Sequence, residues 1–164
     1  MKIDELIRAL PKAELHVHLD GSLRPATMLD IARSEGVSLP ADTEQALAAA
    51  MVADDAADLD EYLKRFAWTL SVMQTAPALE RIAYELALDH HAENVRYMEV
   101  RWSPRLNTEQ GLSLDEALLA PIRGLERAAA ETGIRWGVIV CALRHWDPDV
   151  SRELAELAVS HREK

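Results

Sequence analysis

Three β-type runs separated by long helical patterns constrain the fold of this chain more than any other feature. The runs cover residues 13–19, 95–102 and 134–143. Stretches with apolar residues at helical spacing lie between them, such as "ERIAYELALDHHAEN" and "SLDEALLAPIRGLERAAAETG". Strands that alternate with helices form parallel sheets, because a parallel pair needs a crossover connection. The sequence therefore predicts an α/β fold with a parallel sheet.

Local signals predict where several helices begin and end. Pro25 is placed as a first helical residue, and Gly36 as the stop of the same helix. Ser113 and Glu116 have the spacing of a capping box at the start of a later helix. Pro121 lies inside that later pattern, and we expect it to kink or split the helix.

The first run, "AELHVHLDG", carries polar side chains at every second position. A strand turns successive side chains to opposite faces of its sheet. The apolar set, which we expect to pack outward against helices, is Leu15, Val17 and Leu19. The polar set, which we expect to point into an enclosed interior, is His16, His18 and Asp20.

Two imidazoles two residues apart on one strand can bind a single ion. Neutral imidazole is a good ligand for zinc. Asp20 and Gly21 follow at the C-terminal end of the strand, where parallel α/β folds bind their ligands. The alternative is an edge strand whose polar face is simply hydrated, and the pattern by itself leaves both interpretations open.

Charge and cysteine content exclude several classes of partner and site. The formal net charge of −10 offers no basic patch, so we expect no nucleic-acid partner and no acidic membrane. Cys141 is the only cysteine, which excludes an intrachain disulfide and a thiolate metal cluster. The polar N-terminus does not resemble a signal peptide, and no apolar run reaches about 18 residues. We therefore expect a cytoplasmic protein.

Two further groups of residues have a structural and a functional interpretation. Glu99 and Arg101 share a strand face, and the expectation that they pair with each other is favoured over a role at the mouth of a pocket. The helical stripe that includes Tyr62, Leu63 and Phe66 is most simply explained as helix core.

The stretch "LPKAELHVHLDGSLRP" closely resembles the start of adenosine deaminases of the amidohydrolase superfamily. The blocks "LDEYLKRF", "ERIAYELALDHHAENVRYMEVRWSP" and "VIVCALRH" resemble later parts of the same family in the same order. The resemblance implies a metal-dependent hydrolase with a (β/α)₈ TIM barrel. Residues 1–164 would form the N-terminal part of that single domain, about three βα units plus extra helices, incomplete at its C-terminus. Such barrels run to about 250 residues.

The same resemblance implies a site and a reaction. His16 and His18 would be the first two ligands of one Zn²⁺ ion, and His18 and Asp20 would contact the nucleoside substrate, with Asp20 accepting from the ribose. The helix with Tyr62, Leu63 and Phe66 would form an apolar wall of the purine pocket. The implied activity is hydrolytic deamination of adenosine, and of 2'-deoxyadenosine, in purine salvage. Adenosine gives inosine and ammonia.

The remaining machinery of the family belongs to later strands. No residue of this segment is assigned to the third histidine ligand or to the glutamate general acid, which we expect beyond residue 164. We therefore expect the segment alone to be inactive and capable of self-association. A sister purine aminohydrolase, acting on adenine or another adenosine derivative, is one alternative. A non-catalytic remnant or interaction module is the other.

Overall fold

The computed structural model describes residues 2–52 and 58–163, with the side chains of residues 59–61 left out. In these ranges the elements are α1 (Ile3–Ala9), β1 (Lys12–His18), η1 (Leu19–Gly21), α2 (Pro25–Glu35), α3 (Glu44–Met51), α4 (Leu59–Lys64), α5 (Phe66–Ser71), α6 (Ala76–Ala92), β2 (Val95–Trp102), η2 (Pro104–Asn107), α7 (Leu114–Thr132), β3 (Arg135–Val140) and α8 (Pro148–Ser160). Within this part of the chain, no helix combines the length and the apolar character needed to cross a membrane.

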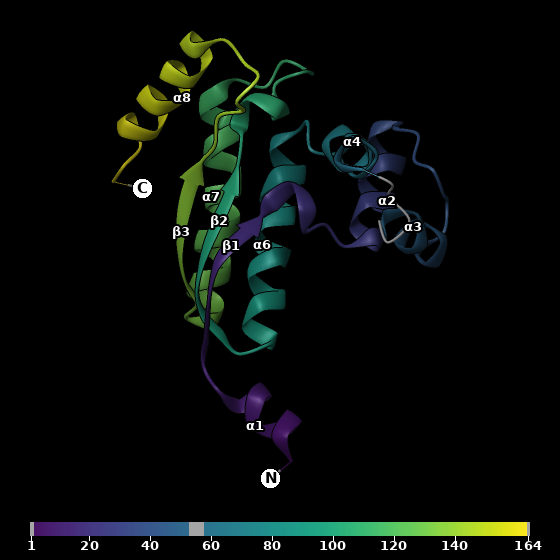
Figure 1. Ribbon diagram of the computed structural model, residues 1–164, viewed down its shortest axis with the longest axis vertical. Helices are drawn as coiled ribbons and strands as arrows, with labels where there is room; N and C mark the ends of the chain where they lie inside the picture. Colours follow the sequence, from purple (N-terminus) through teal and green to yellow (C-terminus); the bar gives the residue numbers. More distant parts are fainter. Residues whose placement is uncertain (1, 53–57, 164) are drawn as a thin grey trace.

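The sheet is parallel, as the alternation of strands and helices predicts. Among the described residues it has three strands in the order β1-β2-β3. The second run is a strand over the predicted residues, whereas the first begins and ends one residue earlier and the third is shorter at both ends. Figure 1 shows α6 and α7 side by side on one face of the sheet, while no described element lies over the other face. We call this uncovered side the open face.

Alternation along β2 divides the sheet into a core side and an open side. Met98 and Val100 are fully buried, and Trp102 is nearly so. Tyr97, Glu99 and Arg101, which alternate with them, stay partly exposed. Since α6 and α7 lie on one face, the buried set packs against these helices and the partly exposed set lines the open face.

A glycine lets α6 and α7 approach closely. A Cβ atom on Gly124 would overlap the carbonyl oxygen of Glu80 and lie 2.9 Å from the backbone nitrogen of Tyr84. The same helix contains Pro121, and the expectation that this proline could split it is wrong: one helix runs through it, with Pro121 buried. Its missing N–H removes a single intrahelical hydrogen bond, and packing of the flanking turns keeps the helix continuous.

The predicted helix ends are confirmed. Pro25 begins α2, and Gly36 ends it in the left-handed conformation at φ 70°. The Ser113 side chain accepts a hydrogen bond from the Glu116 backbone at 3.2 Å. These local signals give the helices their boundaries independently of tertiary contacts.

A register shift interrupts the pairing of β1 with β2, and one of the side chains expected to pack against helices is exposed. Glu14 pairs with Met98 and Val17 with Val100, so three residue steps on β1 oppose two on β2. Val17 is half-buried and Leu19 is fully buried, as expected. Leu15, however, is 56% exposed, and the prediction that it packs against helices is wrong. β1 is an edge strand of the described sheet, so Leu15 has a neighbouring strand on one side only.

Candidate functional site at the end of the first strand

A tight turn fixes the residues that follow β1. The strand ends at His18, and the 3₁₀ turn η1 carries Asp20 and Gly21. Leu19 anchors this turn in the core with no exposed surface. The Ser22 hydroxyl donates to the backbone carbonyl of His18 at 2.5 Å, which closes the turn. The side chain of Asp20 therefore has a defined position at the C-terminal end of the sheet.

The two histidines of β1 point toward each other. Their Nε2 atoms lie 3.3 Å apart, and their ring centroids lie 5.3 Å apart with an interplanar angle of 32°. His16 is exposed, and the His18 side chain keeps 49% of its surface. The enclosed interior that the sequence predicts around them is not formed by the described residues. The imidazoles lie on the open face instead.

Asp20 continues the same line of polar groups. Its Oδ1 lies 3.5 Å from Nδ1 of His18, and its side chain is 14% exposed. Among the described residues this oxygen is buried without a hydrogen-bond partner. Burial raises the pKa of Asp20 above its ordinary value, against a smaller opposing effect of His18. A hydroxyl donor from a ligand would satisfy the unpaired oxygen.

The Asp20 carboxyl borders a small cavity of about 110 Å³. The side chains and backbone that line it are Asp20, Gly21, Met51, Tyr62, Arg65, Phe66 and Thr69. The ring of Phe66 lies against η1, since a Cβ on Gly21 would come within 3.7 Å of it. The rings of Tyr62 and Phe66 are 5.6 Å apart between centroids. Aromatic faces next to a hydrogen-bond acceptor suit a planar ligand that carries hydroxyl groups.

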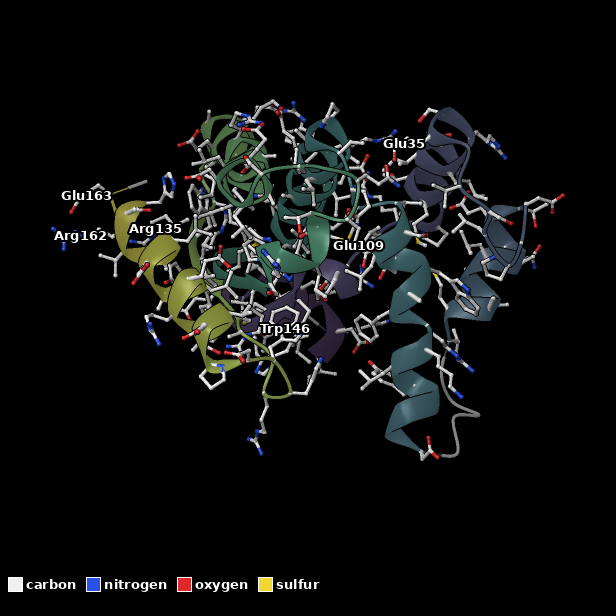
Figure 2. All side chains as sticks on the ribbon, turned by 90° about the horizontal axis from the view of Figure 1, so that it is seen from above. Glu35, Glu109, Arg135, Trp146, Arg162 and Glu163 are labelled. Carbon is white, nitrogen blue, oxygen red and sulfur yellow. The ribbon has the colours of Figure 1, made fainter. Side chains whose placement is uncertain are left out.

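Only two of the three residues predicted to form the pocket wall line the cavity. Tyr62 and Phe66 line the cavity, whereas Leu63 is 49% exposed and lies outside its lining. Tyr62 is also 44% exposed, so the interpretation of this stripe as helix core is wrong for Tyr62 and Leu63. Figure 2 shows α4 and α5 on the side of the molecule away from α8, next to α2 and α3.

Arg65, Thr69 and Met51 line the cavity without having been singled out from the sequence. The sequence does contain a signal for Arg65 and Thr69. Tyr62, Arg65, Phe66 and Thr69 follow the i, i+3, i+4, i+7 spacing of one helical face. Met51 belongs to a different helix, and no local pattern connects it to this cavity.

The two imidazoles fit part of a zinc site. Zinc–nitrogen bonds of about 2.0–2.1 Å in tetrahedral geometry place neighbouring ligand nitrogens about 3.3 Å apart. The Nε2 atoms of His16 and His18 have this separation. In residues 2–52 and 58–163 no group of three or more histidine, cysteine or acidic side chains is arranged to hold a metal. The described residues therefore offer two imidazoles at a suitable separation and no complete metal site.

Arg101 lies beside His18 in the strand register. Its Nε is buried and finds no hydrogen-bond partner among the described residues. The expected pair with Glu99 is not formed, since Glu99 accepts from the hydroxyl of Tyr97 at 2.9 Å. Burial raises the pKa of the nearby Cys141 thiol, while the charge of Arg101 opposes the rise. Arg101 thus brings positive charge to the polar end of the open face.

Sequence comparison identifies relatives over nearly the whole chain. The sequence model of the family described as "Adenosine deaminase" matches residues 11–164. An adenosine deaminase from Mycobacteroides abscessus is 47% identical over 96% of this chain. One from Vibrio atlanticus is 41% identical over 90% of it. The chain covers 45% of each of these two relatives, so it spans about half their length.

Comparison with solved structures gives the same architecture. An amidohydrolase from Burkholderia ambifaria with bound Zn superposes with a TM-score of 0.80 at 29% identity, over 96% of this chain and 43% of that one. An N6-mAMP deaminase from Arabidopsis superposes with a TM-score of 0.80, also at 29% identity, over 96% of this chain and 48% of that one. An adenine deaminase from Arthrobacter aurescens, at 23% identity, has a TM-score of 0.82 over 94% of this chain and 46% of that one.

Proposed function

Because this chain belongs to the adenosine deaminase family, we propose that it is the N-terminal part of an enzyme that hydrolyses adenosine to inosine and ammonia. The observation that carries the proposal is the line of groups at the end of β1. Two imidazole nitrogens 3.3 Å apart are followed by an acidic oxygen 3.5 Å from the second imidazole, beside an aromatic cavity. This arrangement brings a metal-binding pair, a hydroxyl acceptor and an apolar surface together at the C-terminal end of β1.

Each of these groups has a role in the proposed reaction. His16 and His18 would hold zinc, which supplies Lewis acidity for hydrolysis when it is bound. Asp20 would accept a hydrogen bond from the ribose, which satisfies its unpaired Oδ1. Tyr62 and Phe66 would cover the base and exclude water from it.

The choice of adenosine over related substrates has two supports. The sequence is 47% identical to the adenosine deaminase from Mycobacteroides abscessus but 29% identical to the N6-mAMP deaminase from Arabidopsis. In addition, the acceptor at Asp20 has a partner in a nucleoside, whereas free adenine has no hydroxyl to offer. We therefore propose adenosine and 2'-deoxyadenosine as substrates, in purine salvage.

The described residues supply only part of this machinery. We propose that the 164-residue chain alone is inactive and self-associates through the free edges of β1 and β3. The cytoplasmic location expected from the sequence stays a prediction.

A chimeric enzyme tests the proposed function. The chain would be joined to the portion of the Mycobacteroides abscessus enzyme that follows the match, and adenosine turnover would be measured by loss of absorbance. We expect turnover that a chelator removes and zinc restores. A folded chimera that acts on adenine or N6-mAMP but not on adenosine would favour the sister aminohydrolase. A folded chimera with no turnover of any of these substrates would favour the non-catalytic remnant.

A further inference from the structure

Two buried amide side chains join segments that are distant in the sequence. Gln74, between α5 and α6, is 3% exposed, and Asn107, at the end of η2, is 1% exposed. Glutamine and asparagine are mostly exposed in proteins, and a buried amide is costly unless it forms hydrogen bonds. The partners of these two amides therefore show which segments they hold together.

Gln74 connects the end of α5 with the segment that follows β2. Its Nε2 donates to the carbonyl of Leu70 at 2.8 Å and to the carbonyl of Leu106 at 2.9 Å. Its Oε1 accepts from the backbone N–H of Glu109 at 3.1 Å. Leu106 and Glu109 lie 32 and 35 residues beyond Gln74 in the sequence, so these bonds are tertiary contacts.

Asn107 makes a second connection between the same two segments. Its Nδ2 donates to the carbonyl of Met73 at 2.9 Å. The arrangement is reciprocal, because each amide donates to the carbonyl of the residue that precedes the other. Val72 and Met73 are fully buried, so the chain after α5 is also fixed by packing. We call Gln74 and Asn107 the amide clamp.

The amide clamp holds the C-terminal end of a helix that lines the cavity beside Asp20. α5 has six residues, and a helix of this length is not stable without tertiary contacts. Phe66, at its first position, lies against η1, and Thr69 lines the cavity one residue before Leu70. α5 is thus fixed to the end of β1 through η1 and to the end of β2 through η2. Because these strands are parallel neighbours, both anchors lie at the same edge of the sheet.

We propose that Gln74 and Asn107 are positioning residues for substrate binding. The amide clamp sets the distance between Asp20 and the aromatic wall formed by Tyr62 and Phe66. Neither clamp residue lines the cavity, so their effect on a ligand passes through α5. Displacement of a positioned group by about 1 Å can cost about 100-fold in rate, so a wall that shifts would bind the base less well. The proposal rests on the proposed function in one respect, which is that adenosine is the ligand.

Substrate kinetics of the chimeric enzyme test the amide clamp. Gln74→Met keeps the length of the side chain and removes its hydrogen bonds. We expect KM for adenosine to rise about tenfold while kcat changes less than about twofold, because the wall contributes to binding of the ground state and the transition state alike. Asn107→Ala removes a single hydrogen bond, should fold even if Gln74→Met does not, and should raise KM about threefold.

Thr75→Val is the matched control for these variants. The hydroxyl of Thr75 donates to Glu35 of α2 at 2.6 Å, so this change also removes a hydrogen bond between distant segments, next to Gln74 in sequence but without contact to η2. It should lower stability and leave KM unchanged. An equal rise of KM in Thr75→Val and Gln74→Met would overturn the proposal, and so would an unchanged KM in Gln74→Met.

A double-mutant cycle separates positioning from a general loss of stability. If the amide clamp acts by placing Phe66, then Gln74→Met should raise KM less than about twofold in a Phe66→Ala background. A merely structural role predicts that the two effects on KM multiply. Multiplied effects would therefore overturn the proposal.

Hydrogen exchange tests the amide clamp without relying on turnover. In the same chimera, Gln74→Met should raise the exchange rates of the α5 amides more than about tenfold, and Thr75→Val should not. Failure of the proposed function has a different signature, because the unmodified chimera would then not act on adenosine while α5 would still respond to Gln74→Met. Unchanged protection of α5 in Gln74→Met would overturn the proposal.

Discussion

The Nε2 atoms of His16 and His18 lie 3.3 Å apart on the open face of the sheet. Two neutral imidazoles at this separation either share one hydrogen bond or bind one ion. In the chimeric enzyme we predict one zinc per chain, and loss of most of the metal when either histidine is replaced by Ala. Elemental analysis of the purified variants measures this directly. Full zinc occupancy in the double variant would show that other residues hold the ion.

Asp20 should distinguish a nucleoside from a free base. In the chimera, Asp20→Ala removes an acceptor whose hydrogen bond to the ribose we expect to contribute about 1.5–3 kcal/mol. This corresponds to a decrease of roughly 10- to 150-fold in kcat/KM for adenosine. Free adenine, which has no ribose, should be affected much less, and Asp20→Asn should retain part of the effect. Equal losses for adenosine and adenine would exclude a ribose contact.

The 164-residue chain alone should be inactive and associated. The described residues offer two imidazoles to the proposed zinc site, and zinc sites ordinarily have three or four protein ligands. Its sheet leaves the outer edges of β1 and β3 unpaired in the part of the chain described. Size-exclusion chromatography with light scattering and an adenosine assay check both points. A sharp monomer peak would contradict the expected association. Zinc-dependent turnover would contradict the expected inactivity.

Gly124→Ala should destabilise the protein although it adds a better helix former. In an exposed helix this change would stabilise by about 0.4–1 kcal/mol. Here the added Cβ would overlap the carbonyl oxygen of Glu80 on α6. We expect a loss of at least about 1–3 kcal/mol, the usual cost of overpacking. Urea unfolding at a fixed protein concentration gives the value, and an unchanged midpoint would mean that α6 and α7 can separate freely.

Cys141 should react slowly with alkylating reagents. Burial raises the pKa of its thiol above the ordinary value of 9.0, so the reactive thiolate is scarce at pH 8. Since the chain has a single cysteine, the rate of iodoacetamide modification against pH reports this group alone. The midpoint should lie above 9.0 in the folded protein and rise further in Arg101→Leu, which removes a charge that lowers the pKa. A midpoint below 9.0 would contradict the burial of the thiol.

Local chemistry explains why much of the fold could be predicted. The strand at Val95–Trp102 and the start of α2 at Pro25 depend on neighbouring residues. The cap at Ser113 likewise bonds a backbone group three residues away. The polar line from His16 to Asp20 was also visible, because side-chain alternation is a property of the strand itself.

Tertiary structure decided the features that depend on the register between distant segments. The register shift in β1 arises from its pairing with β2, about 80 residues away in sequence, and no pattern within β1 indicates it. Pro121 stays within one helix because packing outweighs the loss of one hydrogen bond. Phe66 meets Gly21 because α5 folds back onto η1. The sequence by itself determined where most helices and strands lie and the order of the polar groups, since these depend on near neighbours. Contacts between distant segments decided which side chains close the cavity and which remain uncovered, because only the folded chain brings those segments together.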